Sequence, residues 1–401
     1  DCMRNYMSFR ANKNVIVPLL MFRSLSNVVL TFVLASTLPS AEASMILFVF
    51  TLATQVRGVS ELNLSNFCVL RIQDGVNIRS FSIWLLVWQF LTVLAALAVC
   101  STFLNVIVLD ALAYSLVFFV ICNQGLWGLV YAYGSADGNF ERHLVSQGSF
   151  LASAVLGLHL YPMFAIHFFL AFGLLSLAYF FWVVIGFDNS KSTSTPLTIQ
   201  VVSYIKPFAL NNLSALFFVL LTMPLVVKIL PSTEYVIYTL AIQVSGIFLF
   251  LYRGVSKNIL AGLYARKSKN EGEEKLIVLI LAIAGFLFLL PYLDLQFFSQ
   301  LSVNLGDLSL NFEFLMLASG LGLMTLINLH QNNCLQAIDK NWPLLGFRVF
   351  SNSILFASMW LFFRFADEPV FRTILAIDYL VVLTAVILTR VYLTRYWRSI
   401  L

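Results

Sequence analysis

Charged side chains are scarce in this sequence. Asp, Glu, Lys and Arg make up 11% of its 401 residues, whereas an ordinary soluble domain has about 25%. Hydrophobic residues reach 60%, and the mean hydropathy is +0.89. The apolar runs are about 20 residues long, enough for helices to cross a bilayer, and they lack the alternation of barrel strands. The composition predicts an all-α polytopic membrane protein.

Groups that perform catalysis or hold metals are also few. The four histidines are scattered and the five cysteines show no paired spacing, so we expect no metal site. The sequence has no phosphate-binding P-loop and no nucleophile elbow. Its longest predicted outer loop, 294–311, contains no His, Lys or Arg. We therefore expect no enzymatic activity, no cofactor apart from a coupling ion (H⁺ or Na⁺), and no nucleic-acid partner.

One motif occurs twice. Each copy reads Leu-Pro-Ser-x-Glu, then an apolar segment with one glutamine, then Arg-Gly-Val-Ser, and the copies span 38–60 and 230–256. They begin 192 positions apart, nearly half of the chain, which is typical of two homologous lobes rather than a long array. We predict an N-terminal six-helix lobe over 1–190 and a C-terminal six-helix lobe over 191–401.

Twelve apolar segments follow one another along the chain. A polar stretch, 188–198, separates the first six from the last six and reads as the linker between the lobes. The predicted segments are 15–38, 45–60, 81–104, 112–133, 144–160 and 163–186, then 204–229, 235–256, 276–293, 312–337, 344–363 and 370–389.

The distribution of Lys and Arg predicts the orientation. If the N-terminus is inside, 18 of the 24 basic residues fall in cytoplasmic segments and three in outer ones. Basic residues concentrate in cytoplasmic loops, so both termini are expected in the cytoplasm. Because each lobe has an even number of helices, the two lobes would be parallel repeats.

Three arginines, Arg23, Arg57 and Arg253, lie within predicted membrane helices. Each would cost about 2.5–3.5 kcal/mol at a helix centre, so we expect them to face water or a partner. Polar residues with helical spacing surround them and would line a hydrated cationic cavity open to the inner leaflet, where guanidinium groups suit phosphate. The predicted substrate-binding set is Arg23, Asn27, Gln55, Arg57, Gln243 and Arg253.

Two alternatives remain open at this stage. Arg57 and Arg253 lie near predicted helix ends, so they would also be able to snorkel to the interface, with Glu61 as a partner for Arg57. Asp378, the single carboxylate near mid-membrane in the predicted helices, is either a coupling-ion or proton site or a counter-charge to an arginine.

Several segments resemble a known family. The Val-Arg-Gly-Val-Ser-Glu-Leu-Asn-Leu-Ser run of 56–65, the run 131–140 after the fourth helix, and Leu-Gln-Ala-Ile-Asp-Lys-Asn at 335–341 are similar to cytoplasmic turns of polysaccharide (O-antigen type, Wzx-like) flippases. These belong to the multidrug/oligosaccharidyl-lipid/polysaccharide exporter superfamily. The resemblance covers most of the chain. It departs at Glu61-Leu62-Asn63, where family members often have Asp-Leu-Gly.

The resemblance implies a V-shaped pair of bundles in the bacterial inner membrane. By alternating access it would move an undecaprenyl-pyrophosphate-linked sugar repeat unit from the inner to the outer leaflet. Its partners would be that lipid-linked anionic oligosaccharide, membrane lipids, and polysaccharide polymerase and chain-length proteins. Two other functions compete: a drug/cation exporter of the same superfamily, which should carry carboxylates in its cavity, and a polysaccharide polymerase or ligase, which should have a large outer loop.

Overall fold

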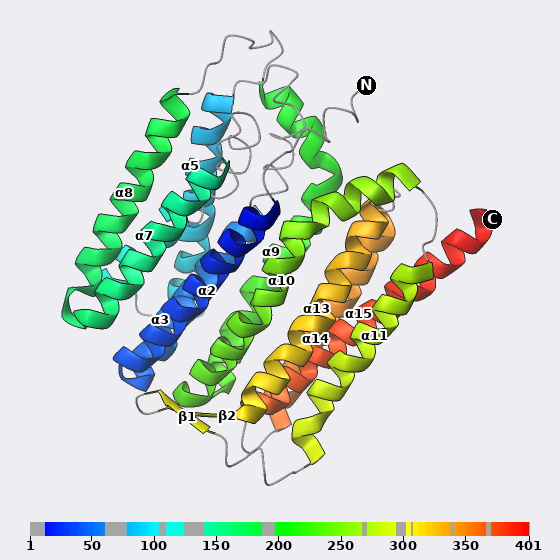
Figure 1. The fold of residues 1–401 in the computed structure, drawn as a ribbon. Coiled ribbons are helices and arrows are strands. Elements are labelled where there is room, and N and C mark those ends of the chain that lie inside the picture. The colour runs from blue at the N-terminus through cyan, green and yellow to red at the C-terminus, as the bar shows by residue number, and fades with distance from the viewer. Residues whose placement is uncertain are drawn as a thin grey trace. The chain divides into compact units, whose positions relative to one another are not determined.

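The computed structural model consists mainly of long helices (Figure 1). The described residues are 13–60, 78–103, 110–123, 140–186, 197–266, 271–293, 302–305, 308–337, 341–365 and 370–400. They contain twelve long helices, six in each half of the sequence. The prediction of an all-helical protein with two six-helix halves is confirmed.

The helices of the first half are joined mostly by segments outside the described residues. They are α2 (Lys13–Thr37), α3 (Ser40–Ser60), α5 (Ile78–Ala98), which ends in a π-helical turn (Val99–Phe103), the helix Ala111–Asn123, α7 (Phe140–Leu160) and α8 (Ala165–Gly186). A short 3₁₀ turn, Pro162–Phe164, links α7 to α8.

The second half continues the pattern with longer helices. They are α9 (Leu197–Ile229), α10 (Ser232–Arg266), α11 (Glu271–Leu289) with a 3₁₀ turn (Leu290–Leu293), α13 (Phe312–Ala337), α14 (Asn341–Phe365) and α15 (Phe371–Ile400). Helix α9 begins seven residues before its predicted start, whereas α10 and α15 continue past their predicted last residues by ten and eleven residues. Residues 188–196 of the predicted linker lie outside the described residues, and its last two residues, 197 and 198, begin α9.

The chain forms two compact units. One comprises residues 1–33 and 48–216, and the other comprises 34–47 and 217–401. The turn between α2 and α3 thus belongs to the unit that contains most of the second half, and the first part of α9 belongs to the other. The predicted lobe boundary at 190 stays a prediction.

Both copies of the repeated motif form the same helix–turn–helix. In each, one helix ends just before the Leu-Pro pair and the next begins at the serine, Ser40 or Ser232. The carbonyl oxygen of the proline accepts a hydrogen bond from the backbone N–H four residues on, from Ala43 in the first copy and Tyr235 in the second, at 2.8 Å in both. Proline is well suited to the position before a helix because its fixed φ is helical and its missing N–H is not needed there. The repeat in sequence is therefore a repeat in structure.

Helix α13 is the centre of the second unit, where it contacts α10, α11, α14 and α15. Two glycines allow this close packing. A Cβ at Gly320 would lie 3.0 Å from the carbonyl oxygen of Ala284 on α11, and one at Gly322 would lie 2.8 Å from the carbonyl oxygen of Ser245 on α10. Small residues commonly let membrane helices approach in this way.

A β-hairpin precedes α13 where the sequence predicted only an outer loop. Strand β1 (Ser302–Leu305) pairs antiparallel with β2 (Leu308–Asn311), with Leu305 opposite Leu308. The residues between the strands are Gly-Asp in the sequence, a pair typical of two-residue hairpin loops. The hairpin lies within the predicted outer loop, 294–311, where no strands were predicted.

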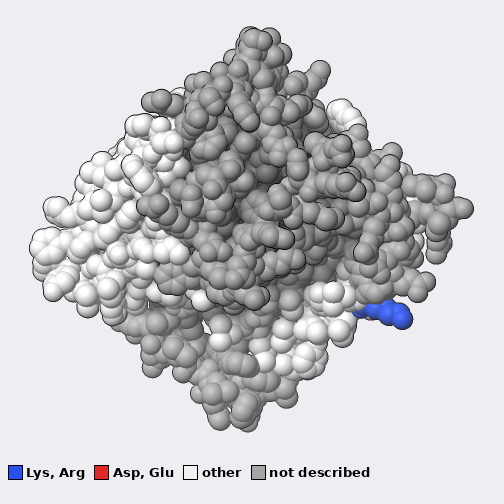
Figure 2. Space-filling view, turned by 45° about the horizontal axis from the view of Figure 1, so that its top comes forward, with Lys and Arg blue, Asp and Glu red and all other residues white. Residues whose placement is uncertain are grey.

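The protein is a multi-pass membrane protein. Seven of the described helices are long and apolar enough to cross a bilayer, and four further helices contain shorter apolar segments, Leu25–Thr37, Ala111–Asn123, Val145–Leu160 and Lys275–Leu289. Many large apolar side chains are exposed, including Trp84, Leu91 and Phe286, as expected for surfaces that face lipid. In the view of Figure 2 the described surface is almost all uncharged, with basic residues at one edge.

Candidate functional site

The first unit buries polar side chains along α2 and α3. Asn27 and Thr31 on α2 are both buried, and the Thr31 hydroxyl donates to the backbone oxygen of Asn27 at 3.0 Å. Thr51 on α3 is buried and Gln55, one turn later, is half-buried. Burying polar groups in a membrane protein is costly unless they have partners or line a hydrated space. The predicted polar faces of these two helices are therefore directed inward.

Arg57 is buried in the last turn of α3, with 8% of its surface exposed. Two hydrogen bonds shape this turn. The Ser60 hydroxyl donates to the backbone oxygen of Arg57 at 2.9 Å, and the Trp88 indole N–H of α5 donates to the backbone oxygen of Ser60 at 3.1 Å. The carbonyl groups in the last turn of a helix have no intrahelical donor. Here the Ser60 hydroxyl and the Trp88 indole N–H are the donors. This burial favours an interior position for Arg57 over snorkelling; its suggested partner Glu61 lies outside the described residues.

The other predicted site residues divide between the two units. Asn27, Gln55 and Arg57 belong to the first unit, whereas Gln243, half-buried on α10, belongs to the second. Arg23 lies on α2 and Arg253 on α10, but their side chains are outside the described residues. Because α10 continues to Arg266, Arg253 is not in a last helical turn, contrary to expectation. A cavity shared by the two sets stays a prediction.

Asp378 is partly buried near the start of α15 and has a partner on α10. The Tyr238 hydroxyl donates to its Oδ2 atom at 3.0 Å. The Tyr238 ring lies near that of Tyr235, with ring centroids 6.3 Å apart and the ring planes tilted by 41°. A carboxyl group held by a phenol inside a membrane helix can exchange a proton or help to bind a cation. The sequence left two alternatives for Asp378, an ion or proton site and a counter-charge to an arginine. The partner shown by this contact is a neutral phenol.

Several polar residues were not selected from the sequence. Tyr238 resembles any other aromatic residue of an apolar helix, so nothing local marks it. Arg348 lies within α14 and is half-buried. It was counted with the cytoplasmic basic residues, although it falls inside the predicted helix 344–363, and that position was the signal that could have identified it.

A buried pair of amides joins two helices of the first unit. The Asn123 side-chain N–H₂ donates to the backbone oxygen of Gln147 at 3.2 Å and to the Ser176 hydroxyl at 3.3 Å, and the Gln147 amide donates back to the backbone oxygen of Asn123. All three residues are fully buried. This reciprocal pair fastens α7 to the helix Ala111–Asn123, and Ser176 adds α8.

Potential metal ligands do not gather in the described part of the chain, where no group of three or more His, Cys, Asp or Glu side chains occurs. The arrangement offers instead a buried guanidinium with amide and hydroxyl groups in one unit, and a carboxyl–phenol pair in the other.

The comparisons with known proteins identify the fold. No protein-family model and no curated protein matches the sequence. An inward-facing multidrug resistance MATE family transporter of the MOP superfamily is similar in structure, with a TM-score of 0.64, 12% identity, and coverage of 96% of this chain and 98% of that one. A MATE in its straight conformation has a TM-score of 0.54 and 12% identity, covering 98% and 97%. The chain has a MATE-like fold with two six-helix halves.

Proposed function

We propose that this protein is an alternating-access transporter that moves a lipid-linked anionic oligosaccharide repeat unit, carried on undecaprenyl pyrophosphate, from the inner to the outer leaflet of the bacterial inner membrane. The MATE-like fold supports the transporter class, because similarly folded proteins are transporters. It does not select the substrate. The choice of substrate rests on the chemistry of the interior.

The observation that carries this proposal is the buried Arg57. Its guanidinium is positively charged, and the planar fork of an arginine can donate two parallel hydrogen bonds to a phosphate group. The polar side chains of Asn27, Thr51 and Gln55 would supply neutral donors and acceptors for sugar hydroxyls. Arg23, Gln243 and Arg253 would complete the site in the manner expected from the sequence.

The transporter would lower the barrier to crossing about 30 Å of hydrocarbon. It makes and breaks no bond; it replaces the hydration of the pyrophosphate and sugars with arginine, amide and hydroxyl groups. Asp378 would couple the movement to H⁺ or Na⁺, because carboxyl groups within membrane helices are rare and typically mark ion or substrate pathways. Partners would be membrane lipids and the polymerase and chain-length proteins that act on the same sugar unit.

A second candidate function is a drug/cation antiporter, and Asp378 is the observation that favours it. An organic cation requires a carboxylate, and Asp378 with Tyr238 is a carboxyl group beside an aromatic ring, which also attracts cations. The similar structure described as a multidrug resistance transporter agrees with this alternative. We prefer the anionic substrate because the buried Arg57 supplies the positive charge that an anion requires.

The deciding experiment locates the lipid-linked sugar after deletion of the gene. If the protein is the flippase, single repeat units on their lipid carrier accumulate on the cytoplasmic face and react with an impermeant periodate or lectin probe in inverted vesicles but not in intact cells. Accumulation on the outer face, with single units reaching the surface, would instead favour a polymerase or ligase. Unchanged lipid-linked sugar together with increased sensitivity to cationic drugs would favour the antiporter.

A further inference from the structure

Two hydrogen bonds connect α10 to α15, which are in contact within the second unit. At the start of α15, the backbone N–H of Phe371 donates to the Glu234 carboxylate at 2.8 Å. Deeper in the unit, the Tyr238 hydroxyl donates to Asp378 at 3.0 Å. On α10 the two contacts are one helical turn apart, and on α15 they are about two turns apart. The bond between Phe371 and Glu234, called the outer contact below, therefore lies one turn of α10 away from the carboxyl–phenol pair of Asp378 and Tyr238.

The outer contact is a helix cap supplied by a distant residue. The first N–H groups of a helix have no intrahelical acceptor, and the helix dipole favours a negative charge at this end. Phe371 is the first residue of α15, and Glu234 satisfies its N–H. The next residue, Arg372, forms an ion pair with Glu313 at the start of α13. The first turn of α15 is therefore fastened to both α10 and α13.

The position of Asp378 depends on that first turn. Each residue of a helix turns the side chains by about 100°, so a small rotation or slide of α15 would carry the carboxyl group away from the Tyr238 hydroxyl. Among the described residues, the Tyr238 hydroxyl donates a hydrogen bond to Asp378. A contact that restrains both the rotation and the depth of α15 therefore favours formation of this pair.

We propose that Glu234 is a positioning residue: by capping α15 at Phe371, it sets the rotation and depth that bring Asp378 to the Tyr238 hydroxyl. This gives the glutamate of the second repeated motif a specific role. The inference rests on the proposed coupling role of Asp378 only for its importance in transport; the positioning itself is a matter of structure.

The first copy of the motif offers a matched control. Glu42 occupies the same place as Glu234, three residues after a proline whose carbonyl makes the same 2.8 Å backbone bond. Yet Glu42 is exposed, whereas Glu234 is half-buried and bonded to α15. Replacing Glu42 changes the same residue type in the same local backbone without touching the cap of α15.

The test measures how fast Asp378 reacts with an apolar carbodiimide, dicyclohexylcarbodiimide, in membranes that contain the full-length protein. Mass spectrometry of the peptide that contains Asp378 gives the rate. Glu234→Ala should raise the rate by roughly five- to thirtyfold, the factor that corresponds to one or two kcal/mol, because the carboxyl group loses its partner and its shielding. Tyr238→Phe, which removes that partner directly, sets the upper limit.

Conservative variants separate positioning from general damage. Glu234→Gln keeps an oxygen that accepts the Phe371 N–H, so its rate should stay near that of the unaltered protein, as should the rate of Glu42→Ala. A second pair tests the donor: Phe371→Pro and Phe371→Ala both lose the ring, but only proline also loses the N–H, and proline is tolerated at the first position of a helix. The proline variant should react faster than the alanine variant.

The proposal is overturned if Glu234→Ala reacts at the unaltered rate, if Glu42→Ala raises the rate as much, or if the two Phe371 variants react alike. The last comparison decides the matter if Glu234→Ala fails to reach the membrane. The readout needs no transported substrate. Asp378→Asn with unchanged ion-dependent transport would remove the coupling role and leave the positioning result intact.

Discussion

Tyr238 and Asp378 form a hydrogen bond between helices although they lie 140 positions apart in the sequence. The bond brings a phenol and a carboxyl group together in the apolar interior of the second unit. Each group gives the other a partner that surrounding lipid or apolar side chains would not provide. This pair is the part of the molecule where an ion would be expected to act on the conformation.

We expect Asp378→Asn to abolish the dependence of transport on an ion gradient. Asparagine has nearly the same shape and can still accept the Tyr238 hydrogen bond, but it cannot bind a proton or neutralise Na⁺. The measurement uses proteoliposomes with an imposed pH or Na⁺ gradient, and the gradient that drives the unaltered protein identifies the ion. Tyr238→Phe should retain gradient dependence at a reduced rate. Gradient-driven transport by Asp378→Asn would show that coupling occurs elsewhere.

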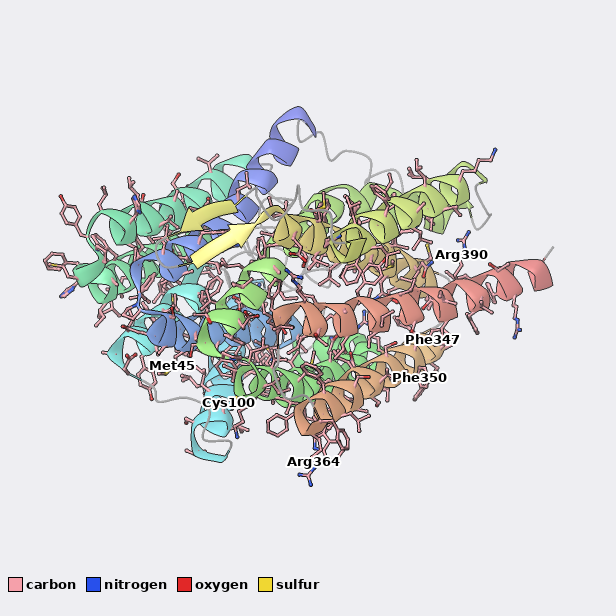
Figure 3. The ribbon with its side chains drawn as sticks, turned by 90° about the horizontal axis from the view of Figure 1, so that it is seen from below. Met45, Cys100, Phe347, Phe350, Arg364 and Arg390 are labelled. Carbon is pink, nitrogen blue, oxygen red and sulfur yellow. The ribbon has the colours of Figure 1, made fainter. Side chains whose placement is uncertain are left out.

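Arg57→Ala should weaken binding of a pyrophosphate-linked sugar lipid by at least about tenfold, because charged hydrogen bonds contribute about 1.5–3 kcal/mol. Arg57→Lys should recover part of the affinity, since an ammonium supplies charge without the fork. Binding is measured on purified protein in detergent. Arg364→Ala is the control: Arg364 is exposed at the end of α14 and points away from the helices (Figure 3). Equal losses for Arg57→Ala and Arg364→Ala would point to a general charge effect.

Trp88→Phe should reproduce part of the Arg57 effect. Phenylalanine keeps an aromatic ring but lacks the N–H that donates to the Ser60 carbonyl, so the last turn of α3 loses a contact worth about 1 kcal/mol. We expect a few-fold weaker binding of the same sugar lipid, measured in the same detergent assay. Trp360→Phe, at an exposed position of α14, is the matched substitution and should leave binding unchanged. Unaltered binding in Trp88→Phe would contradict a role in positioning Arg57.

Gly322→Ala should destabilise the second unit by about 1–3 kcal/mol, as overpacking commonly does. The added Cβ would lie 2.5 Å from the Phe248 ring and 2.8 Å from the Ser245 carbonyl, so α10 and α13 would have to separate. Gly346→Ala on α14 meets nothing within 4 Å and should be neutral or slightly stabilising, because alanine is the better helix former. Thermal unfolding in detergent measures both. Equal unfolding temperatures for the two variants would show that α10 and α13 can separate to accommodate the added methyl group at little cost.

The orientation predicted from the basic residues can be tested by labelling single cysteines in a cysteine-free background. Cysteines at Ser40, Ser232 and Ser309 should react with an impermeant thiol reagent in whole cells. Those at Ser80, Ser192 and Ser268 should react only after the membrane is broken. Labelling of the second group in intact cells would refute a cytoplasmic location for these segments.

Burial and packing explain which site residues could be predicted. The inward positions of Arg57 and Asn27 could be predicted because a polar residue in an apolar run is costly to expose to lipid, and both are buried; their role in a binding site stays a prediction. Phe347 illustrates the opposite case: it contacts the Tyr392 ring of α15, with centroids 5.8 Å apart, and lies between α14 and α15 (Figure 3). Nothing in a run of apolar residues tells which of them will face a neighbouring helix.

The sequence by itself determined the membrane class, the twelve helices and the duplicated helix–turn–helix, since hydrophobic length and a proline before a helix act locally. Only the tertiary structure decided that Glu234 caps α15 while Glu42 is exposed, that Asp378 meets Tyr238, and that Trp88 donates to the Ser60 carbonyl at the end of the helix that carries the buried Arg57. These contacts join residues far apart in the chain, and they depend on the rotation and depth at which helices pack. Local pattern does not contain that information, because many rotations bury the same apolar surface almost equally well.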